Sequence, residues 1–190
     1  MLLRLGAAAV ECFERHGPGV TISTIADHAG VSRRTVSRYV STKEELLYVH
    51  QRLWLTIWEG ALDRSLPLAT RMLVSSRAVA TSIDADPDPP RRTMRVARRY
   101  PSLLQGFHSV FQYWIDRVAA EVLVDHPDHP LESRVVGSAV MGAVDASLRA
   151  WLDSEEPFSP LFERSYALIR PVLDQLPAPS VENGHLNRSR

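Results

Sequence analysis

The organisation of this chain is decided by residues 21–46, which read TISTIADHAGVSRRTVSRYVSTKEEL. Two short helical segments flank Gly30, and Thr21 and Ser32 are suitable N-caps for the first and the second of them. A short turn that contains glycine sets two helices at roughly 90–120° and lets the second helix protrude. The stretch therefore predicts a helix-turn-helix, with a projecting second helix that begins at Ser32 and ends near Val40.

The predicted projecting helix is basic, although the chain as a whole is neutral. Its 190 residues contain 22 Lys and Arg and 22 Asp and Glu, so the total charge does not indicate a nucleic-acid partner. Between Val31 and Lys43, however, there are cations and no acid. A charge run taken alone is most often a solvated helix face. Following a glycine turn, the arginines favour DNA binding, because a guanidinium can donate two parallel hydrogen bonds to guanine in the major groove.

The same stretch resembles the DNA-binding signature of TetR-family regulators. The matching residues are Thr21, Ile25-Ala26, Ala29-Gly30-Val31-Ser32, Thr35-Val36 and Lys43-Glu44, preceded by Ala8-Ala9, Phe13 and Gly17. The resemblance covers about the first quarter of the chain. It implies a homodimer that places two recognition helices in successive major grooves of double-stranded operator DNA.

The DNA contacts expected from the residue types and the resemblance are Thr21, Ser32, Arg33, Arg34, Thr35, Ser37, Arg38, Tyr39 and Lys43. The family pattern implies that Arg33, Arg34 and Thr35 approach bases or nearby phosphates. Ser37, Tyr39 and Lys43 are expected mostly at phosphates. Ser37 departs from the pattern, since many relatives have an aromatic residue there. The sequence also begins almost at the first helix, without the basic leader usual in the family.

The whole sequence predicts an all-α protein of about nine helices, because helical periodicity recurs and strand signals are nearly absent. The helices are expected at Leu2–His16, from Thr21, from Ser32 to Val40, from a capping box at Thr42, from Pro67, and at Pro90–Arg99, Pro101–Asp125, Pro130–Ser154 and Pro160–Leu176. A stiff acidic loop is expected from Asp84 to Pro90.

The expected domains are a three-helix helix-turn-helix DNA-binding domain at residues 1–44 and a helical bundle for ligand binding and dimerisation at residues 45–177. The bundle's role is implied by the family resemblance. Residues 178–190 are polar and are expected to form a disordered tail.

Aromatic side chains beyond the predicted DNA-binding domain are candidates for an effector pocket. The predicted ligand-binding residues are Trp54, Trp58, Arg95, Phe107, Phe111 and Trp114. An aromatic stripe is more often core than pocket wall, and both explanations stay open, because ligand cavities are also lined mainly by apolar and aromatic groups.

Five arginines lie between residues 91 and 99, and they suggest two different roles. They either form a solvated or acid-paired face, or bind an anionic headgroup such as the phosphates of a coenzyme A thioester. Arg98-Arg99-Tyr100-Pro101-Ser102-Leu103, with Trp114 after it, resembles TetR members whose sensor domains bind acyl-CoA-like ligands. The effector is thus expected to be a small molecule, either acyl-CoA-like or another apolar or anionic compound.

The helix expected from Pro130 carries small residues at three- and four-residue spacing, which let helices approach closely. We expect it to form the dimer interface with the following helix, through Gly142, Ala143, Ala146, Ala150 and Trp151. Asp145 and Arg149 are spaced for an ion pair on one helix surface.

Other classes of protein find little support in the sequence. No Gly-rich phosphate loop, serine elbow or paired-cysteine motif is present, and Cys12 lies on an apolar stripe, so no enzyme and no cofactor are expected. Prolines interrupt the acidic run at residues 84–90 and the His-containing segment 125–130, so no metal site is expected. No apolar run approaches the roughly 20 residues that span a bilayer, which predicts a cytoplasmic protein.

Three functions remain. The favoured one is a repressor that a small-molecule effector releases from a palindromic operator. The alternative is a helix-turn-helix regulator whose C-terminal domain binds a protein partner or has no ligand. A third, an enzyme with a helix-turn-helix-like start, would have to turn over an acyl or similar substrate.

Overall fold

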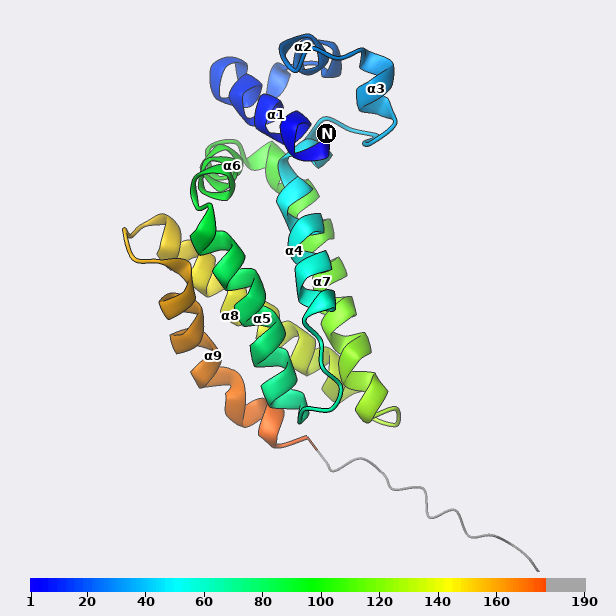
Figure 1. The fold of residues 1–190 in the computed structure, drawn as a ribbon, viewed down its shortest axis with the longest axis vertical. Coiled ribbons are helices and arrows are strands. Elements are labelled where there is room, and N and C mark those ends of the chain that lie inside the picture. Colours follow the sequence, from blue (N-terminus) through cyan, green and yellow to red (C-terminus); the bar gives the residue numbers. More distant parts are fainter. Residues whose placement is uncertain (177–190) are drawn as a thin grey trace, which may run out of the picture.

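The computed structural model describes residues 1–176, which form nine α-helices and no strand, as expected for an all-α protein (Figure 1). The helices are α1 Leu2–His16, α2 Ile22–His28, α3 Arg33–Ser37, α4 Val49–Gly60, α5 Leu68–Ala85, α6 Asp88–Arg99, α7 Leu104–Asp125, α8 Pro130–Leu152 and α9 Phe158–Asp174. Short 3-10 segments are η1 Gly17–Gly19, η2 Glu44–Tyr48 and η3 Pro101–Leu103. The tail predicted at residues 178–190 lies outside the described residues.

The helices are arranged as a small head and a longer body (Figure 1). Helices α1–α3 form the head, and α4 leads from the head into the body, which is built from α4, α5, α7, α8 and α9. Helix α6 packs against α1, so it lies where the head meets the body. Each part has its own apolar core, and Val110 packs against both.

Two predicted helix starts are confirmed by their caps. The Thr21 hydroxyl accepts a hydrogen bond from the Thr24 amide at 3.1 Å, and the Ser32 hydroxyl accepts one from the Thr35 amide at 3.1 Å. Helix α3 is shorter than predicted and ends at Ser37. Its last turn tightens, because the Tyr39 amide bonds to the carbonyl three residues back.

The predicted capping box at Thr42 is only half present. The Glu45 carboxylate accepts the amide hydrogens of Ser41 and Thr42 at 3.2 and 3.1 Å, as expected. The next residues nevertheless form η2, and α4 begins only at Val49. This segment packs between α1 and α7 with Leu46, Leu47 and Tyr48 all buried, and that packing overrides the local helix signal.

The stiff acidic loop predicted from Asp84 to Pro90 is wrong, because only Asp86 and Pro87 separate α5 from α6. Asp84 lies in α5, and its carboxylate accepts the amide hydrogens of Phe158 at 2.6 Å and Ser159 at 3.0 Å. It therefore caps the N-terminus of α9 from another helix, where a negative charge also complements the helix dipole.

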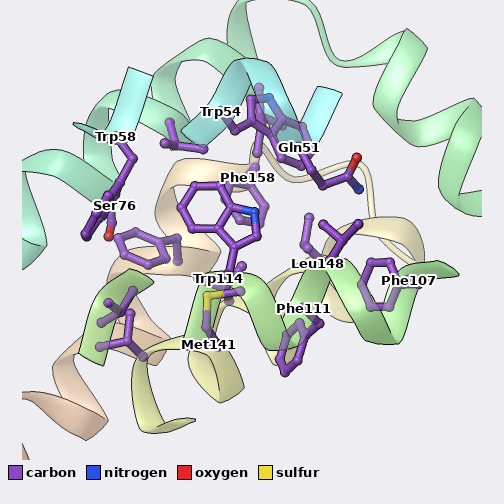
Figure 2. Close-up of a pocket in the computed structure, with 17 residues that line it drawn as sticks. Gln51, Trp54, Trp58, Ser76, Phe107, Phe111, Trp114, Met141, Leu148 and Phe158 are labelled. Carbon is purple, nitrogen blue, oxygen red and sulfur yellow. The ribbon is translucent and has the colours of Figure 1, made fainter. Parts of the chain in front are cut away.

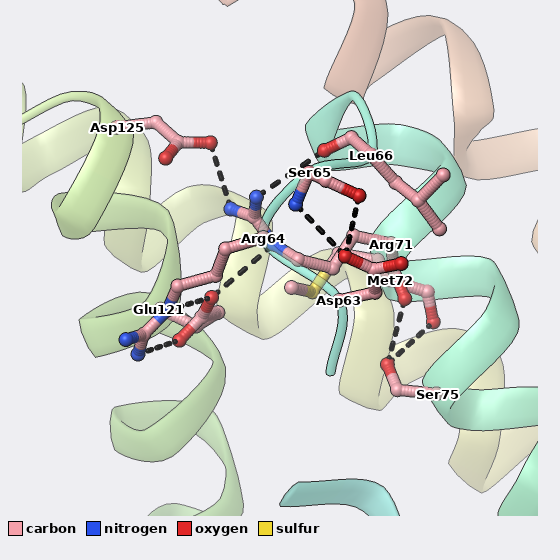
Figure 3. Close-up of polar contacts among 9 residues, drawn as sticks. All are labelled: Asp63, Arg64, Ser65, Leu66, Arg71, Met72, Ser75, Glu121 and Asp125. Atoms are coloured by element: carbon pink, nitrogen blue, oxygen red, sulfur yellow. Dashed lines mark hydrogen bonds and ion pairs between the residues drawn. The ribbon is translucent and has the colours of Figure 1, made fainter. Parts of the chain in front are cut away.

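A buried polar cluster joins the start of α5 to the end of α7 (Figure 3). Arg71 is 1% exposed, and its guanidinium lies 2.7 Å from Asp125 and 3.2 Å from Glu121. Arg64 adds two hydrogen bonds to Glu121, at 3.1 and 2.9 Å. Two cations thus face two carboxylates, which compensates the burial of Arg71 and Glu121.

Helix α8 is long and apolar enough to cross a membrane by length and composition, contrary to the expectation that no segment would be. Its most apolar window is 44% buried inside the protein, and it packs between α7 and α9. The apolar composition is therefore explained by its place as a core helix of the body.

Candidate nucleic-acid interface and sensor cavity

The head presents α3 as its outermost helix (Figure 1). Gly30 has a φ of 64°, a left-handed conformation that glycine adopts at little cost, and this turn redirects the chain between α2 and α3. Val36 and Val40 are 0% and 4% exposed, and they anchor the segment in the core of the head. The predicted DNA residues Arg33, Arg34, Ser37, Arg38 and Tyr39 are left exposed.

The arginines of this segment are free to meet an external anion. Within residues 1–176, Arg33, Arg34 and Arg38 make no hydrogen bond and no ion pair. The arginines of α6 differ, since Arg92 and Arg98 are bonded to carboxylates. Basic side chains on one outward surface without acidic neighbours suit a phosphate backbone and guanine edges.

The remaining predicted DNA residues lie beside these arginines but have other partners as well. The hydroxyls of Thr21 and Ser32 cap α2 and α3, and the Thr35 hydroxyl lies 2.9 Å from that of Ser32. The Lys43 ammonium donates to the Pro18 carbonyl and lies 3.8 Å from Glu44. Lys43 is thus held against η1, which differs from the free phosphate contact expected from the sequence.

The head is fastened internally and to the body by polar contacts. The His28 ring lies 2.7 Å from the Glu11 carboxylate, a hydrogen bond that lowers the pKa of Glu11 and ties α2 to α1. Arg92 in α6 binds Glu14 in α1 at 2.6 Å. The Tyr48 hydroxyl donates to the Leu103 carbonyl, and burial raises its pKa to about 12, so it stays protonated.

The body contains an apolar cavity of about 70 Å³ bounded by α4, α5, α7, α8 and α9 (Figure 2). It is lined by Gln51, Trp54, Trp58, Ser76, Val79, Ile83, Phe107, Val110, Phe111, Trp114, Val118, Val140, Met141, Val144, Leu148, Phe158 and Phe162. The rings of Trp58 and Trp114 meet edge to face, with centroids 6.0 Å apart. Phe107 and Phe111 stack with their centroids 6.0 Å apart, and Phe107 also packs against the core of the head.

The structure brings five of the six predicted ligand residues to this cavity: Trp54, Trp58, Phe107, Phe111 and Trp114. The sixth, Arg95, is exposed on α6 and lines neither the cavity nor the two outer grooves beside it. Sequence reasoning missed the polar members of the lining, Gln51 and Ser76. Gln51 lies three residues before Trp54 on α4, and Ser76 lies three residues before Val79 on α5. This spacing could have indicated that both residues line the cavity.

Comparison with known proteins explains the head. Residues 5–48, which span α1 to η2 and include the unpaired arginines, match the family model described as "Bacterial regulatory proteins, tetR family". The head of this chain is a TetR-family DNA-binding domain. No curated protein sequence matches the chain.

Solved structures extend the likeness from the head to the full fold. The fatty acid degradation regulator FadR from Bacillus halodurans is 15% identical, covers 93% of this chain and 96% of its own, and superposes with a TM-score of 0.60. A transcriptional regulator from Rhodococcus sp. Rha1 is 21% identical, with coverages of 93% and 99% and a TM-score of 0.49. The FadR match establishes a shared fold for head and body together.

The arginines of α6 are largely engaged inside the chain. Arg98 lies 2.7 Å from Asp153, and Arg92 is bonded to Glu14. Arg91 stacks over the Trp151 ring, 4.5 Å from its centroid, and donates to the Trp151 and Ser154 carbonyls at 3.3 Å. These contacts correspond to the acid-paired face expected as one of the two roles, and they tie α6 to the head and to the end of α8.

The residues predicted for dimerisation divide between two faces of α8. Gly142, Ala146 and Ala150 are exposed. Ala143 and Trp151 are 6% and 1% exposed inside the protomer, so little of either side chain is left for a partner to contact. Trp151 packs edge to face on Phe158 of α9 instead. The predicted pair of Asp145 and Arg149 is confirmed, with nitrogen and oxygen 2.7 Å apart.

Proposed function

We propose that this TetR-family DNA-binding regulator is a cytoplasmic homodimeric repressor that a small molecule releases from a palindromic operator. The observation that carries the proposal is the exposed, unpaired arginine surface of α3, held by a head that connects through α4 to an apolar cavity. The absence of catalytic motifs noted in the sequence favours a regulator over an enzyme.

Arg33 and Arg34 are the proposed base readers, because they begin α3 and the N-terminal residues of a recognition helix reach furthest into the major groove. We expect Thr35 and Arg38 to contact bases or phosphates beside them, and Thr21, Ser32, Ser37, Tyr39 and Lys43 to contact the DNA backbone. Two such helices, one per protomer, read half-sites about one helical turn apart or slightly more.

The proposed dimer interface is the outer face of α8 and α9. Exposed Gly142, Ala146 and Ala150 allow a partner helix to approach closely. Leu131 and Val135 on α8, and Leu168 and Val172 on α9, are exposed apolar side chains on the same two helices. Burying them against a second copy would remove this apolar area from water.

The proposed route of regulation runs from the cavity to the head through α4 and α7. Phe107 lines the cavity and also packs against the apolar core of the head, where its ring lies 6.3 Å from that of Tyr48. Gly106 leaves room for Tyr48, since a Cβ there would lie 2.6 Å from its ring. An occupant that displaces Phe107 therefore moves Tyr48, which lies immediately before α4, and changes the spacing of the two heads.

The first test is selection of duplexes from a random pool by the full chain, followed by fluorescence anisotropy on the selected sequence. The proposal predicts a two-fold symmetric site and an affinity that falls by about 10³–10⁵ between 50 and 200 mM salt, for six to ten neutralised phosphates. A flat salt response, or no enriched sequence, would contradict DNA binding through α3.

The second test separates the repressor from a regulator that answers to a protein partner or to nothing. Val144→Phe fills the cavity from α8 and should leave operator binding intact while abolishing release by any cavity ligand. If release by a small molecule persists in Val144→Phe, the effector acts elsewhere. If no cavity ligand weakens the complex of the unaltered protein, the protein-partner alternative gains support.

A further inference from the structure

The wall of the sensor cavity carries no ionisable side chain. Its 17 lining residues include no Asp, Glu, Lys, Arg or His. A carboxylate, phosphate or ammonium brought into such a wall leaves its water shell without a counter-charge, which is strongly unfavourable. The part of a ligand that enters this cavity is therefore uncharged.

The polar groups of the wall are few and neutral, and one of them lacks a partner. The Gln51 side-chain oxygen is buried and makes no hydrogen bond within the described residues. An acceptor left in this state costs about 1–3 kcal/mol, which a ligand that donates a hydrogen bond would recover. Figure 2 shows Gln51 and Ser76 on opposite sides of the cavity, with the Trp114 ring between them.

The arginines of one groove beside the cavity already have carboxylate partners. A groove of about 570 Å³ adjoins the cavity at Gln51, Phe107 and Phe111, and it contains Arg98 and Arg149. Each of these arginines has a carboxylate at 2.7 Å, from Asp153 and Asp145, and both carboxylates line the same groove. An anion bound there would be repelled by these two carboxylates.

The small volume of the cavity also requires its wall to move when a ligand binds. The cavity of about 70 Å³ is smaller than ordinary ligand sites, which hold roughly 300–1,000 Å³. A second groove, of about 620 Å³ between α4 and α7, adjoins it at Gln51, Val110 and Trp114. Gln51 borders the cavity and both grooves, so its side chain moves whenever an occupant extends from the cavity into either.

We propose that the effector is an uncharged, predominantly hydrophobic small molecule that donates a hydrogen bond to the Gln51 side-chain oxygen. This inference rests on the proposed function, in which the cavity is the effector site. It makes Gln51 the residue that selects among hydrophobic ligands, and it disfavours fatty-acid anions and acyl-CoA thioesters.

The experiment compares three ligands that share a ten-carbon chain: 1-decanol, decanoate and decanoyl-CoA. Three of the four tryptophans line the cavity, so tryptophan fluorescence of the full chain reports its occupation. At pH 7.5 we expect 1-decanol to bind at least about 30-fold more tightly than decanoate, because the carboxylate loses its hydration without a counter-charge. Decanoate or decanoyl-CoA binding as tightly as 1-decanol would overturn the proposal, and so would no binding of 1-decanol up to its solubility.

The role of Gln51 is tested with a ligand that lacks the donor. The unaltered protein should prefer 1-decanol to 1-methoxynonane by about 3- to 10-fold, the value of one hydrogen bond. Gln51→Leu should remove this preference, while Gln112→Leu, an exposed glutamine on α7, should keep it. An unchanged preference in Gln51→Leu overturns the assignment. Should Gln51→Leu not fold, equal binding of the two ligands to the unaltered protein would do the same.

The outcomes separate this inference from the proposed function. Binding of 1-decanol without loss of operator DNA would contradict release by a cavity ligand and leave the ligand chemistry standing. Release of DNA by decanoyl-CoA but not by 1-decanol would support the repressor and overturn the uncharged ligand.

Discussion

The arginine side chains at the start of α3 are available because of the residues beneath them. Val36 is fully buried and fixes the helix, and the Ser32 cap fixes where it begins. Arg33 and Arg34 are then exposed to solvent, and neither forms an ion pair with an acidic side chain within the described residues. The availability of these two guanidinium groups is thus set by the arrangement of the neighbouring residues rather than by their own burial.

The first prediction concerns these two arginines. Arg33→Ala and Arg34→Ala should each reduce discrimination between the selected operator and single-base variants, by about 1–3 kcal/mol for a bidentate contact. Competition anisotropy with duplexes altered at one base pair measures this. Arg77→Ala on α5, also an exposed arginine, should change neither affinity nor preference. If all three variants discriminate equally well between these duplexes, Arg33 and Arg34 do not contact the bases.

The second prediction concerns His50 in α4. Burial lowers its pKa, and the Asp86 carboxylate offsets this in part, so the folded protein favours the neutral ring. The unfolded chain takes up the proton near pH 6.5, and His50 therefore contributes stability above that pH that is lost as the pH falls below it.

Urea unfolding between pH 7.5 and 5.5 checks the effect of His50. We expect the unaltered protein to lose stability over this range and His50→Gln to lose less of it. His108→Gln, which changes an exposed histidine on α7, should follow the unaltered protein. A steeper loss in His50→Gln would contradict the lowered pKa.

Sequence reasoning succeeded at the residue scale where the deciding contact is local. The caps of Thr21 and Ser32 bond three residues along the chain, so their signals are complete within one turn. The cavity role of Gln51 was missed, because its environment is made by helices that are distant in sequence. The burial of Trp151 inside the protomer was missed for the same reason.

At the scale of elements, α8 shows how a small-residue pattern serves two surfaces. Gly137 faces α7, where an added Cβ would lie 2.7 Å from the Ile115 carbonyl oxygen. Gly142 faces open space in the protomer. The sequence could not separate the two, because apolar and small residues surround much of this helix. Prolines at Pro130 and Pro101 marked element starts well, since proline fits a first turn.

The third prediction concerns the contact of α7 with α8. Gly137→Ala should push these helices apart and destabilise the protein by about 1–3 kcal/mol, as overpacking does, because the facing atom is backbone. Thermal and urea unfolding report the change. Gly60→Ala, at the end of α4 with no atom within 4 Å of the added Cβ, should cause no such loss. Equal stability of both variants would mean that the helices separate freely.

At the scale of the whole molecule, the predicted all-α architecture is confirmed, and the hydrophobic core has two parts, one in the head and one in the body. The boundary predicted after residue 44 follows the helix-turn-helix pattern alone. The core of the head also contains Leu46, Tyr48, Val96 and Leu103. Only folding reveals that α6 and the start of α7 contribute to it.

The fourth prediction concerns the assembly. Leu168 is 81% exposed on α9, and Leu168→Asp should convert the proposed dimer to monomers without loss of helix content, because a carboxylate opposes burial in an interface. Analytical ultracentrifugation and circular dichroism check both parts. Leu53→Asp, on the exposed side of α4, should remain dimeric. A dimeric Leu168→Asp would move the interface away from this part of α9.

Helix α6 contributes to the core of the head. It therefore affects whether a head can be replaced by one that binds a different operator, in evolution or in engineering. A chimera spliced near residue 44 would pack a foreign head against Val96 and Leu103 of the original body. The contact between head and body would then be left partly exposed or be overpacked. A chimera that also takes the α6 surface of the new head, including the Arg92 that pairs with Glu14, keeps the contact between head and body complementary. Lineages that swap reading heads should therefore carry correlated changes in α6.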